Sequence, residues 1–398
     1  MHITLIAGAR PNFMKIAAIV HAIERFNESR VESQESRVEY RLVHTGQHYD
    51  KNMSDTFFEE LGIPAPDVNL GCGGGTQAEQ TAHIMVEFEK DLIAHPTDVV
   101  LVVGDVTSTM ACSIVAKKLN TKVCHVEAGI RSWDLTMPEE INRMVTDSLA
   151  DYMFTTSDVA NRNLIRSGAM LMNEPLRSMS RDESLNDGMM RQRVWFVGNV
   201  MIDTLLANRA RFRKPEVWDK LGLKEKEYIV MTMHRPANVD EENHLRAMME
   251  QIVDNVHGLP VIFPIHPRTA KMLRELINDG MSATESLNDD RWSNLHIVEP
   301  MGYLEFNYLV ERAKAVVTDS GGITEETTVM GVPCITLRDN TERPETCTVG
   351  TNELIGTNPD AIKPALDKLF AGQWKHGAIP ELWDGHAAER IIEILAGL

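Results

Sequence analysis

The chain has 398 residues, of which 43% are hydrophobic and 25% are charged. This is the composition of a soluble globular protein, and the length suffices for two ordinary domains. The net charge of -18 and the isoelectric point near 5.2 argue against a nucleic-acid or anionic-membrane partner, because binding phosphate backbones requires a basic face. A small anionic ligand held by a few local arginines remains compatible with this charge.

The N-terminal residues lead straight into the apolar run Ile3-Thr4-Leu5-Ile6, with no basic flank and no long apolar stretch. We therefore expect neither a signal peptide nor a membrane span. The five cysteines are odd in number and lack metal-ligand spacing, which suits a reducing cytosol. The expectation is a cytoplasmic protein without a bound metal.

Short apolar strands alternate with longer amphipathic helical stretches, which is typical of doubly wound parallel α/β sheets. A first series of strands is predicted at 3–7, 40–43, 99–103, 122–126, 152–155 and 194–197, with helices at 14–26, 77–93, 108–119 and 139–150. A second series is predicted at 228–232, 261–265, 296–298, 315–317 and 334–337, with helices at 241–256, 269–278, 303–313 and 323–330. We expect two Rossmann-like domains, 1–200 and 201–380. The polar stretches 170–193 and 281–292 break the pattern and are interpreted as surface insertions.

Polar and glycine-rich residues follow the predicted strands, and ligands of open α/β sheets bind beyond the carboxyl ends of the strands. These ends are Gly8-Ala9-Arg10-Pro11, Thr45-Gly46-Gln47-His48, Gly104-Asp105, Glu127-Ala128-Gly129, His234-Arg235-Pro236, His266-Pro267-Arg268, Asp319-Ser320-Gly321-Gly322 and Arg338-Asp339. Two domains that face each other with such ends would enclose an interdomain cleft rich in carboxylate, imidazole and guanidinium groups.

The turn Ser320-Gly321-Gly322 lies between a predicted strand and a predicted helix. Glycines allow the backbone to approach a ligand closely, and the start of a helix offers N–H groups and a positive dipole end, so the turn is a candidate phosphate site. The alternative is an ordinary serine-capped helix after a tight turn. Arg338 and Arg343 follow the next strand and favour a bound dianion.

Each candidate carboxylate also has a structural explanation. Asp105 could cap the helix that follows it. Glu127 follows an apolar strand, so it is either paired, with Arg131 as the candidate partner, or functional. Glu139 follows a proline, as expected in the first turn of a helix.

Several other polar residues carry weaker signals. His234 could be a histidine with satisfied hydrogen bonds, and Lys15 a surface residue unless it shares a pocket with Arg10. The glycine-rich run 71–75 lacks the Lys-Ser/Thr of a phosphate loop, and no GxGxxG follows the first strand. A nicotinamide cofactor is therefore not expected.

Eight motifs occur in a fixed order along the chain: Gly8-Ala9-Arg10-Pro11 with Lys15, Gly46-Gln47-His48, Gly104-Asp105, His125 to Arg131, Pro138 to Arg143, His234-Arg235-Pro236, Asp319 to Glu326 and Arg338 to Glu345. In this order they resemble the non-hydrolysing UDP-N-acetylglucosamine 2-epimerases, over nearly the whole chain except the two insertions. The resemblance implies a glycosyltransferase B-type fold, whose terminal segment 381–398 crosses back to the first domain, and a homodimer.

The resemblance also implies a reaction, the interconversion of UDP-N-acetylglucosamine and UDP-N-acetylmannosamine without a cofactor. In this family UDP leaves C1 with loss of the C2 proton, which gives 2-acetamidoglucal, and then adds back with C2 inverted. The implied acid–base and charge-stabilising residues are Asp105, Glu127 and Glu139, with His234 as a phosphate contact or an acid. The implied UDP contacts are Arg10, Ser320, Gly321, Gly322 and Arg343 at the diphosphate with Lys15 near it, Glu326 at the ribose and Phe306 at the uracil.

Two departures from the family pattern affect the prediction of the substrate. The sequence has Gly8-Ala9-Arg10-Pro11-Asn12 where the family more often has Gly-Thr-Arg-Pro-Glu. The loop 133–137 is short and resembles the branch that includes epimerases of UDP-2,3-diacetamido-glucuronic acid. Gln47-His48-Tyr49-Asp50 differs from the Gln-His-Arg-Gln stretch of members activated by a second substrate molecule, so that activation is not expected. The rival functions are a glycosyltransferase of the same fold, a hydrolysing relative and a non-catalytic nucleotide-sugar sensor.

Overall fold

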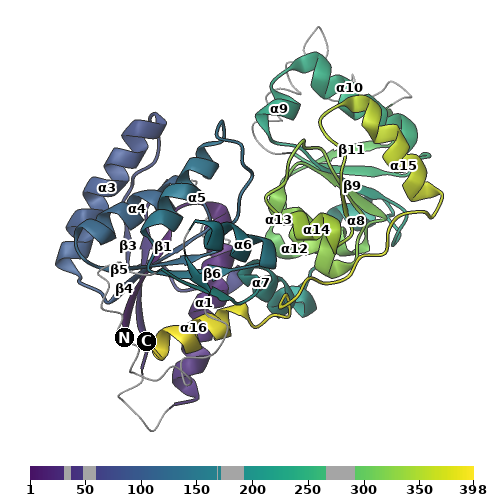
Figure 1. Ribbon diagram of the computed structural model, residues 1–398. Coiled ribbons are helices and arrows are strands. Elements are labelled where there is room, and N and C mark those ends of the chain that lie inside the picture. Colours follow the sequence, from purple (N-terminus) through teal and green to yellow (C-terminus); the bar gives the residue numbers. More distant parts are fainter. Residues whose placement is uncertain (31–36, 48–59, 168, 172–191, 266–291) are drawn as a thin grey trace. The chain divides into compact units, whose positions relative to one another are not determined.

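A computed structural model describes residues 1–30, 37–47, 60–167, 169–171, 192–265 and 292–398. The chain divides into two compact units (Figure 1). Unit 1 comprises Met1–Ala207 and Glu381–Leu398, and unit 2 comprises Asn208–Pro380. The first boundary thus falls in a helix seven residues beyond the predicted position 200.

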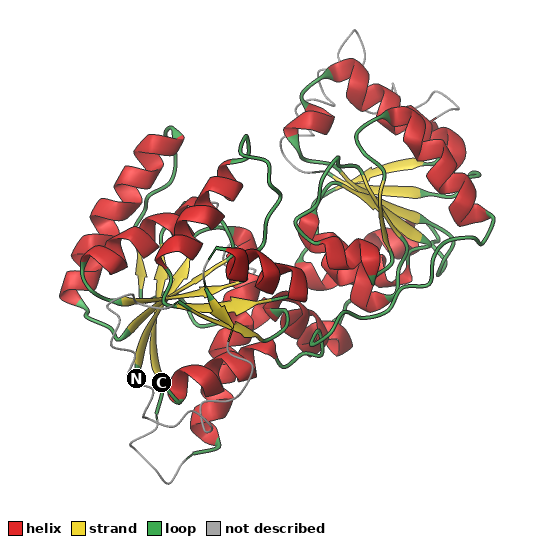
Figure 2. Ribbon diagram, viewed as in Figure 1, coloured by secondary structure: helices red, strands yellow, loops and turns green. Residues whose placement is uncertain are grey.

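Unit 1 contains a parallel sheet of eight strands in the order β3-β2-β1-β4-β5-β6-β8-β7, flanked by helices (Figure 2). The strands are β1 (His2–Ala7), β2 (Glu39–His44), β3 (Val68–Asn69), β4 (Val99–Val103), β5 (Lys122–Val126), β6 (Tyr152–Thr155), β7 (Met170–Leu171) and β8 (Arg193–Phe196). The helices are α1 (Arg10–Glu28), α3 (Gln77–Ala94), α4 (Thr107–Lys118), α5 (Pro138–Leu149), α6 (Asp158–Arg166), α7 (Val200–Asn208) and α16 (Ala387–Ala396). Every residue of β4 is apolar and buried, as expected for a central strand covered on both faces.

The terminal helix α16 packs against α1 within unit 1. Its apolar stripe, Ile391, Ile392 and Leu395, is buried. The carboxylate of Asp203 on α7 accepts hydrogen bonds from the backbone N–H groups of Ala387 and Ala388, at 3.2 and 2.6 Å, and thereby caps the start of α16. The terminal segment is therefore an integral part of unit 1.

Unit 2 contains a parallel sheet of six strands in the order β11-β10-β9-β12-β13-β14. The strands are β9 (Ile229–Thr232), β10 (Val261–Pro264), β11 (Leu295–Val298), β12 (Ala315–Thr318), β13 (Cys334–Thr336) and β14 (Asn352–Leu354). The helices are α8 (Glu216–Lys220), α9 (Pro236–Val239), α10 (Glu242–Asn255), α12 (Tyr303–Arg312), α13 (Gly321–Met330), α14 (Pro344–Thr348) and α15 (Ile362–Phe370), with 3-10 turns at Arg209–Arg211 and Pro359–Ala361.

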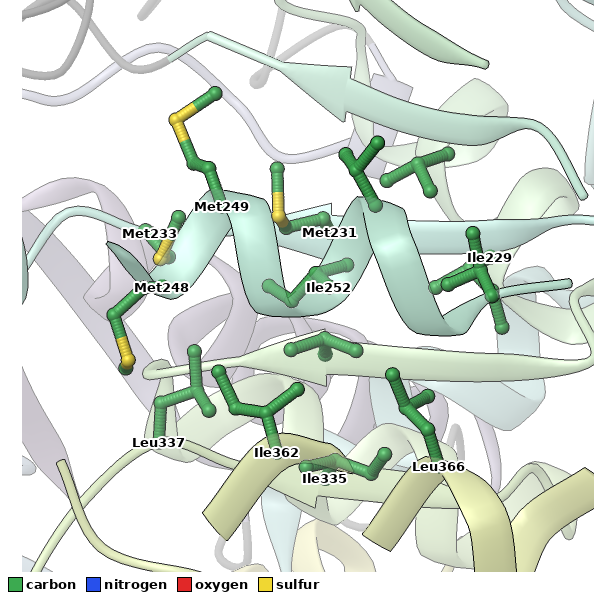
Figure 3. Close-up of a cluster of buried hydrophobic side chains, with 14 of the residues drawn as sticks. Ile229, Met231, Met233, Met248, Met249, Ile252, Ile335, Leu337, Ile362 and Leu366 are labelled. Atoms are coloured by element: carbon green, nitrogen blue, oxygen red, sulfur yellow. The ribbon is translucent and has the colours of Figure 1, made fainter. Parts of the chain in front are cut away.

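The core of unit 2 on one side of the sheet is rich in methionine (Figure 3). Met231 and Met233 come from β9 and its end, and Met248 and Met249 come from α10. They pack with isoleucines and leucines of β13 and α15. Flexible thioether side chains fill irregular gaps between a helix and a twisted sheet without strain.

The prediction of a doubly wound α/β protein with two sheets is confirmed. The helix predicted at 269–278 and the insertion at 281–291 lie outside the described residues, as does 172–191 of the first insertion. The strands β3, β7 and β14 were missed, because a strand of two or three residues is too short to show an alternating or continuous apolar pattern. The helices α6, α7, α8, α9, α14 and α15 were also missed. Of these, α15 has a helical period in Ile362, Leu366 and Leu369.

Strand order reverses direction between β1 and β4 in unit 1 and between β9 and β12 in unit 2. The connections on either side of such a switch point run to opposite faces of the sheet and leave a crevice at the carboxyl ends. Of the strand ends predicted from the sequence, those after β1 and β4 in unit 1 and after β9 and β12 in unit 2 lie at these two positions.

Candidate functional site

In unit 1, the turn after β5 places Glu127 in a buried ion pair with Lys15 of α1. Lys15 Nζ lies 2.6 Å from Glu127 Oε2, and the two side chains are 9% and 2% exposed. Glu127 has a φ of 70°, a left-handed conformation that is uncommon outside glycine. The prediction that Arg131 is the partner of Glu127 is wrong, since Arg131 pairs with Asp147, at 2.6 Å. The surface interpretation of Lys15 is wrong as well.

The turn after β4 carries Asp105, whose carboxylate is held by Arg143 of α5. Arg143 donates to Asp105 Oδ2 from Nε at 3.0 Å and from Nη2 at 2.5 Å. Asn142 donates to the Asp105 carbonyl oxygen at 2.9 Å. The N-cap residue of α4 is Val106, with no side-chain capping bond, so Asp105 does not have the capping role considered above.

The two adjacent glutamates of α5 have different environments. Glu139 is exposed in the first turn of the helix, and Glu140 is fully buried. Glu140 accepts hydrogen bonds from the N–H groups of Ser132 and Trp133 and an ion-paired bond from Arg143, at 2.6 Å. Glu140 therefore joins the short loop before α5 to the Asp105–Arg143 pair. Sequence reasoning missed this role, because two successive glutamates after a proline look alike.

In unit 2, the centre of the site is Asp319, at the end of β12. Its fully buried carboxylate accepts from the backbone N–H groups of His234 and Arg235, at 3.0 and 2.9 Å, and from Asn238 Nδ2 at 3.1 Å. Burial alone would raise the pKa of Asp319, but these donors and the His234 ring outweigh burial, and the net pKa is lowered. Asp319 is thus an anion that fixes the turn after β9.

Asp319 also orients the imidazole of His234. Nδ1 of His234 lies 2.8 Å from Asp319 Oδ1, and the histidine side chain is 39% exposed. Because a carboxylate can only accept, Nδ1 carries the proton in this pair. The geometry is that of an oriented proton donor or hydrogen-bonding group.

The turn 320–322 leads directly into α13. Ser320 occupies the N-cap position but makes no side-chain capping bond, which disfavours the capped-helix alternative. A methyl group added at Gly321 would lie 3.6 Å from Arg338 Nη1, an ordinary contact distance. Space and backbone conformation therefore do not require glycine there, whereas close approach of a ligand to the first N–H groups of the helix would.

The carboxylate of Glu326, one helical turn further along α13, lies in a buried environment. Its Oε1 accepts a hydrogen bond from the Tyr303 hydroxyl at 2.9 Å. Burial raises the pKa of Glu326 to about 7, with the Tyr303 hydrogen bond opposing the shift and Glu325 adding to it. Phe306, on α12, is half-buried and packs against the apolar cluster around Tyr228.

Both arginines after β13 are paired with buried glutamates. Arg338 donates two hydrogen bonds to Glu342, each of 2.8 Å. Arg343 donates from Nε to Glu325 Oε1 at 2.5 Å. Their planes are thereby fixed. Arg10 is the first residue of α1, while His48, His266 and Arg268 lie outside the described residues.

Three further observations bear on ligands and location. Within the described ranges, no three His, Cys, Asp or Glu side chains gather as a metal-binding set. The five cysteines are free. No helix in the same ranges is long and apolar enough to cross a bilayer.

Comparison with known proteins decides the family. The family model described as UDP-N-acetylglucosamine 2-epimerase matches residues 30–396. The chain belongs to this family. A UDP-N-acetylglucosamine 2-epimerase of Methanocaldococcus jannaschii is 37% identical over 99% of both chains. A UDP-2,3-diacetamido-2,3-dideoxy-D-glucuronate 2-epimerase of Pseudomonas aeruginosa is 35% identical over the full length of both.

Solved structures give the same result for the fold. The crystal structure of the Methanocaldococcus jannaschii UDP-GlcNAc 2-epimerase in complex with UDP-GlcNAc and UDP matches all of both chains with a TM-score of 0.82 and 36% identity. A lipopolysaccharide outer core galactosyltransferase matches with a TM-score of 0.51 and 13% identity, which is a likeness of fold alone. The prediction of a glycosyltransferase B-type fold is confirmed.

Proposed function

We propose that the chain is a non-hydrolysing UDP-N-acetylglucosamine 2-epimerase that interconverts UDP-N-acetylglucosamine and UDP-N-acetylmannosamine. The observation that carries this proposal is the end-to-end match to an epimerase at 37% identity. The carboxylates of Asp105 and Glu127, at the ends of the neighbouring strands β4 and β5 of unit 1, support it, because epimerisation needs groups that move a proton at carbon. The enzyme is an isomerase and uses no cofactor.

The chemistry follows from the low acidity of the C2 hydrogen, since no carbonyl group is attached to C2. Departure of UDP breaks the C1–O bond, with both electrons leaving on the phosphate, and gives C1 positive character. A base then removes the C2 proton, and the C–H electrons form the C1=C2 bond of 2-acetamidoglucal. Re-addition of UDP at C1 with protonation of C2 from the opposite face completes the inversion.

We assign the acid–base and charge-stabilising work to Asp105, Glu127 and Glu139 of unit 1. Opposite-face protonation requires at least two such groups or a mobile one. In unit 2, His234 contacts the phosphate or protonates the departing oxygen through Nε2. The UDP contacts that we assign are Arg10, Lys15, Phe306, Ser320, Gly321, Gly322, Glu326 and Arg343.

Incubation with UDP-N-acetylglucosamine alone in heavy water tests the proposal. The expected result is deuterium at C2 and formation of UDP-N-acetylmannosamine without any acceptor. Free N-acetylmannosamine with UDP would indicate a hydrolysing relative, a requirement for an acceptor would indicate a glycosyltransferase, and binding without exchange would indicate a sensor. Each of these three results contradicts the proposal.

Asp105 offers a residue-level test. Asp105→Asn keeps the size of the side chain but removes the charge that can take up a proton. We expect UDP binding, measured by calorimetry, to change little and turnover to fall by orders of magnitude. Unchanged turnover would remove Asp105 from the acid–base set.

A second candidate substrate is a UDP-2,3-diacetamido-glucuronic acid. It is favoured by the 35% identical Pseudomonas aeruginosa relative. Measuring kcat/KM for both sugars discriminates the two, and a value at least tenfold higher for the diacetamido sugar would reassign the substrate while leaving the chemistry intact.

We further propose that two copies associate through the outer face of the α3–α4–α5 layer of unit 1. Helix α4 packs against both α3 and α5. Val86 and Ile93 of α3 and Ile141 and Met144 of α5 are 44 to 63% exposed. Large apolar side chains on one layer of helices favour an isologous contact.

Light scattering tests this association. The wild type is expected at twice the chain mass of 44.7 kDa, and Ile141→Glu at the mass of the monomer. Ile165→Glu on α6, which replaces another exposed isoleucine, is the matched control and should leave the dimer intact.

The free cysteines support the cytoplasmic location that we also propose.

A further inference from the structure

His125, on β5 of unit 1, connects the two turns that carry Asp105 and Glu127. Its Nε2 lies 2.8 Å from the carbonyl oxygen of Gly104, and its Nδ1 lies 2.7 Å from Oδ1 of Asp147 on α5. The ring is fully buried. Both contacts are within ordinary hydrogen-bond distance.

These two partners determine the charge of the ring. A carbonyl oxygen and a carboxylate oxygen can only accept, so both ring nitrogens must donate, and a ring with two N–H groups is an imidazolium. Either neutral tautomer would point a nitrogen lone pair at an oxygen lone pair. A protonated Asp147 would remove this conflict, but Asp147 accepts from the N–H of Gly129 at 3.1 Å and pairs with Arg131.

Asp147 accepts these bonds as an ionised carboxylate. Burial by itself would raise the pKa of Asp147, but His125 and Arg131 outweigh burial, and the net pKa lies below its ordinary value. The cluster of His125, Arg131 and Asp147 therefore holds two positive charges and one negative charge. The cations are 0% and 6% exposed at their side chains. One net positive charge is left in a dry environment.

The atoms that this cluster holds belong to the two carboxylate-bearing turns. The Gly104 carbonyl is part of the peptide bond to Asp105, and the Gly129 N–H lies two residues after Glu127. Gly104, Glu127 and Gly129 all have left-handed φ values, of 67°, 70° and 78°. Glycine adopts such a φ freely, whereas at Glu127 the conformation persists only where contacts hold it. The charged groups nearest the two turns besides the cluster are Lys15 at Glu127 and Arg143 with Glu140 at Asp105.

We infer that His125 is a positioning residue that carries a proton on both ring nitrogens and fixes the turns of Asp105 and Glu127 relative to each other. This inference rests on the proposed epimerase function for its consequence, but the charge of the ring can be tested without any activity. The ring donates to the Gly104 carbonyl and holds the Gly129 N–H through Asp147, so it acts on the two turns without contacting the substrate.

The first test is the charge itself. Two-bond ¹H–¹⁵N correlation spectra of the ¹⁵N-histidine-labelled protein report both ring nitrogens of each of the 14 histidines. The His125 signals are assigned as those lost in His125→Gln. We expect two protonated nitrogens in wild type at pH 7. A nitrogen without a proton at pH 7 would overturn the inference, even if the enzyme epimerises.

The second test separates the two bonds. His125→Asn places an amide near the Nδ1 position, and His125→Gln places one near Nε2, but neither carries charge. We expect kcat to fall by about 10²-fold in both, as small misplacements of reacting groups produce. Kd for UDP should stay unchanged. The acidic limb of the pH–rate profile should move to higher pH, because loss of a buried cation makes a carboxylate base easier to protonate.

The matched control is Asp151→Asn. Asp151 is also buried in unit 1 and accepts from the N–H of Val123, at the opposite end of β5. Its loss should lower stability without moving the acidic limb. If the acidic limb of the pH–rate profile stays in place in both His125 variants, the positioning role is overturned. If the wild type does not epimerise, the proposed function is overturned, and the NMR spectra alone then test the charge of the His125 ring.

Discussion

Replacing Lys15 by methionine isolates the free energy of the buried Lys15–Glu127 pair. The side chains have similar length, so packing is largely preserved, but Glu127 loses the cation at 2.6 Å. Removing one partner of a buried ion pair costs about 3–5 kcal/mol, because the remaining charge loses the opposite charge that stabilised it. The native state can escape this cost by taking up a proton on the carboxylate.

Protonation of Glu127 therefore limits the loss of unfolding free energy and makes this loss depend on pH. Protonating a carboxyl group costs about 1.4 kcal/mol for each pH unit above its ordinary pKa, which is about 4.3 for glutamate. The loss of unfolding free energy is thus at most about 3.7 kcal/mol at pH 7 and about 1 kcal/mol at pH 5. Between pH 5 and pH 7 the variant binds one more proton when folded than when unfolded, so its free energy of unfolding must fall as pH rises.

Urea denaturation of wild type, Lys15→Met and Lys15→Met/Glu127→Gln at pH 5 to 8 measures these quantities. The double variant should recover most of the loss and show no extra pH dependence, since no buried charge remains. Lys117→Met is the control, because its partner Asp151 keeps Lys122 at 3.6 Å. An equal loss at pH 5 and pH 8 for Lys15→Met would refute the reasoning.

Three further outcomes are expected. Burial raises the pKa of Asp203 to about 6 from an unfolded value of 3.8. The contribution of Asp203 to stability is therefore most favourable below pH 4 and is lost as pH rises to 6. Relative to wild type, the unfolding free energy of Asp203→Asn in urea should thus increase by about 3 kcal/mol between pH 4 and pH 8. Tyr303→Phe removes the hydrogen bond that opposes the raised pKa of Glu326, so the pH at which UDP affinity rises, measured by calorimetry, should move above 7. Gly129→Ala, with φ 78° and a backbone oxygen 2.5 Å from the new methyl group, should lose more stability by thermal denaturation than Gly222→Ala, with φ 59° and open space.

The sequence was sufficient to predict the helices and strands whose hydrophobic pattern extends over many residues. Buried parallel strands such as β4 are continuous apolar runs, and the helices between them carry stripes, so two doubly wound sheets followed from pattern alone. The carboxyl ends of the strands then gave the candidate polar residues, but the two switch points required the strand order, which only the structure shows.

Pairing within the site could not be read in the same way. Glu127 has Arg131 four residues away, yet it pairs with Lys15, which is 112 residues distant. Proximity along the chain predicts contacts only within one helix or turn, whereas at a strand end the nearest cation belongs to a neighbouring element. The same limitation hid the partner of Asp105, which is Arg143.

Two of the cations assigned to ligand binding are already paired with carboxylates, Lys15 with Glu127 and Arg343 with Glu325. A chain of net charge -18 repels a nucleotide diphosphate at long range, so electrostatic steering cannot supply its affinity. Affinity must then come from short hydrogen bonds to donors held in place before the ligand arrives. Pairing with a buried glutamate fixes the plane of Arg343, and the ligand need not order it. Carboxylates within the site thus orient the groups that receive an anion.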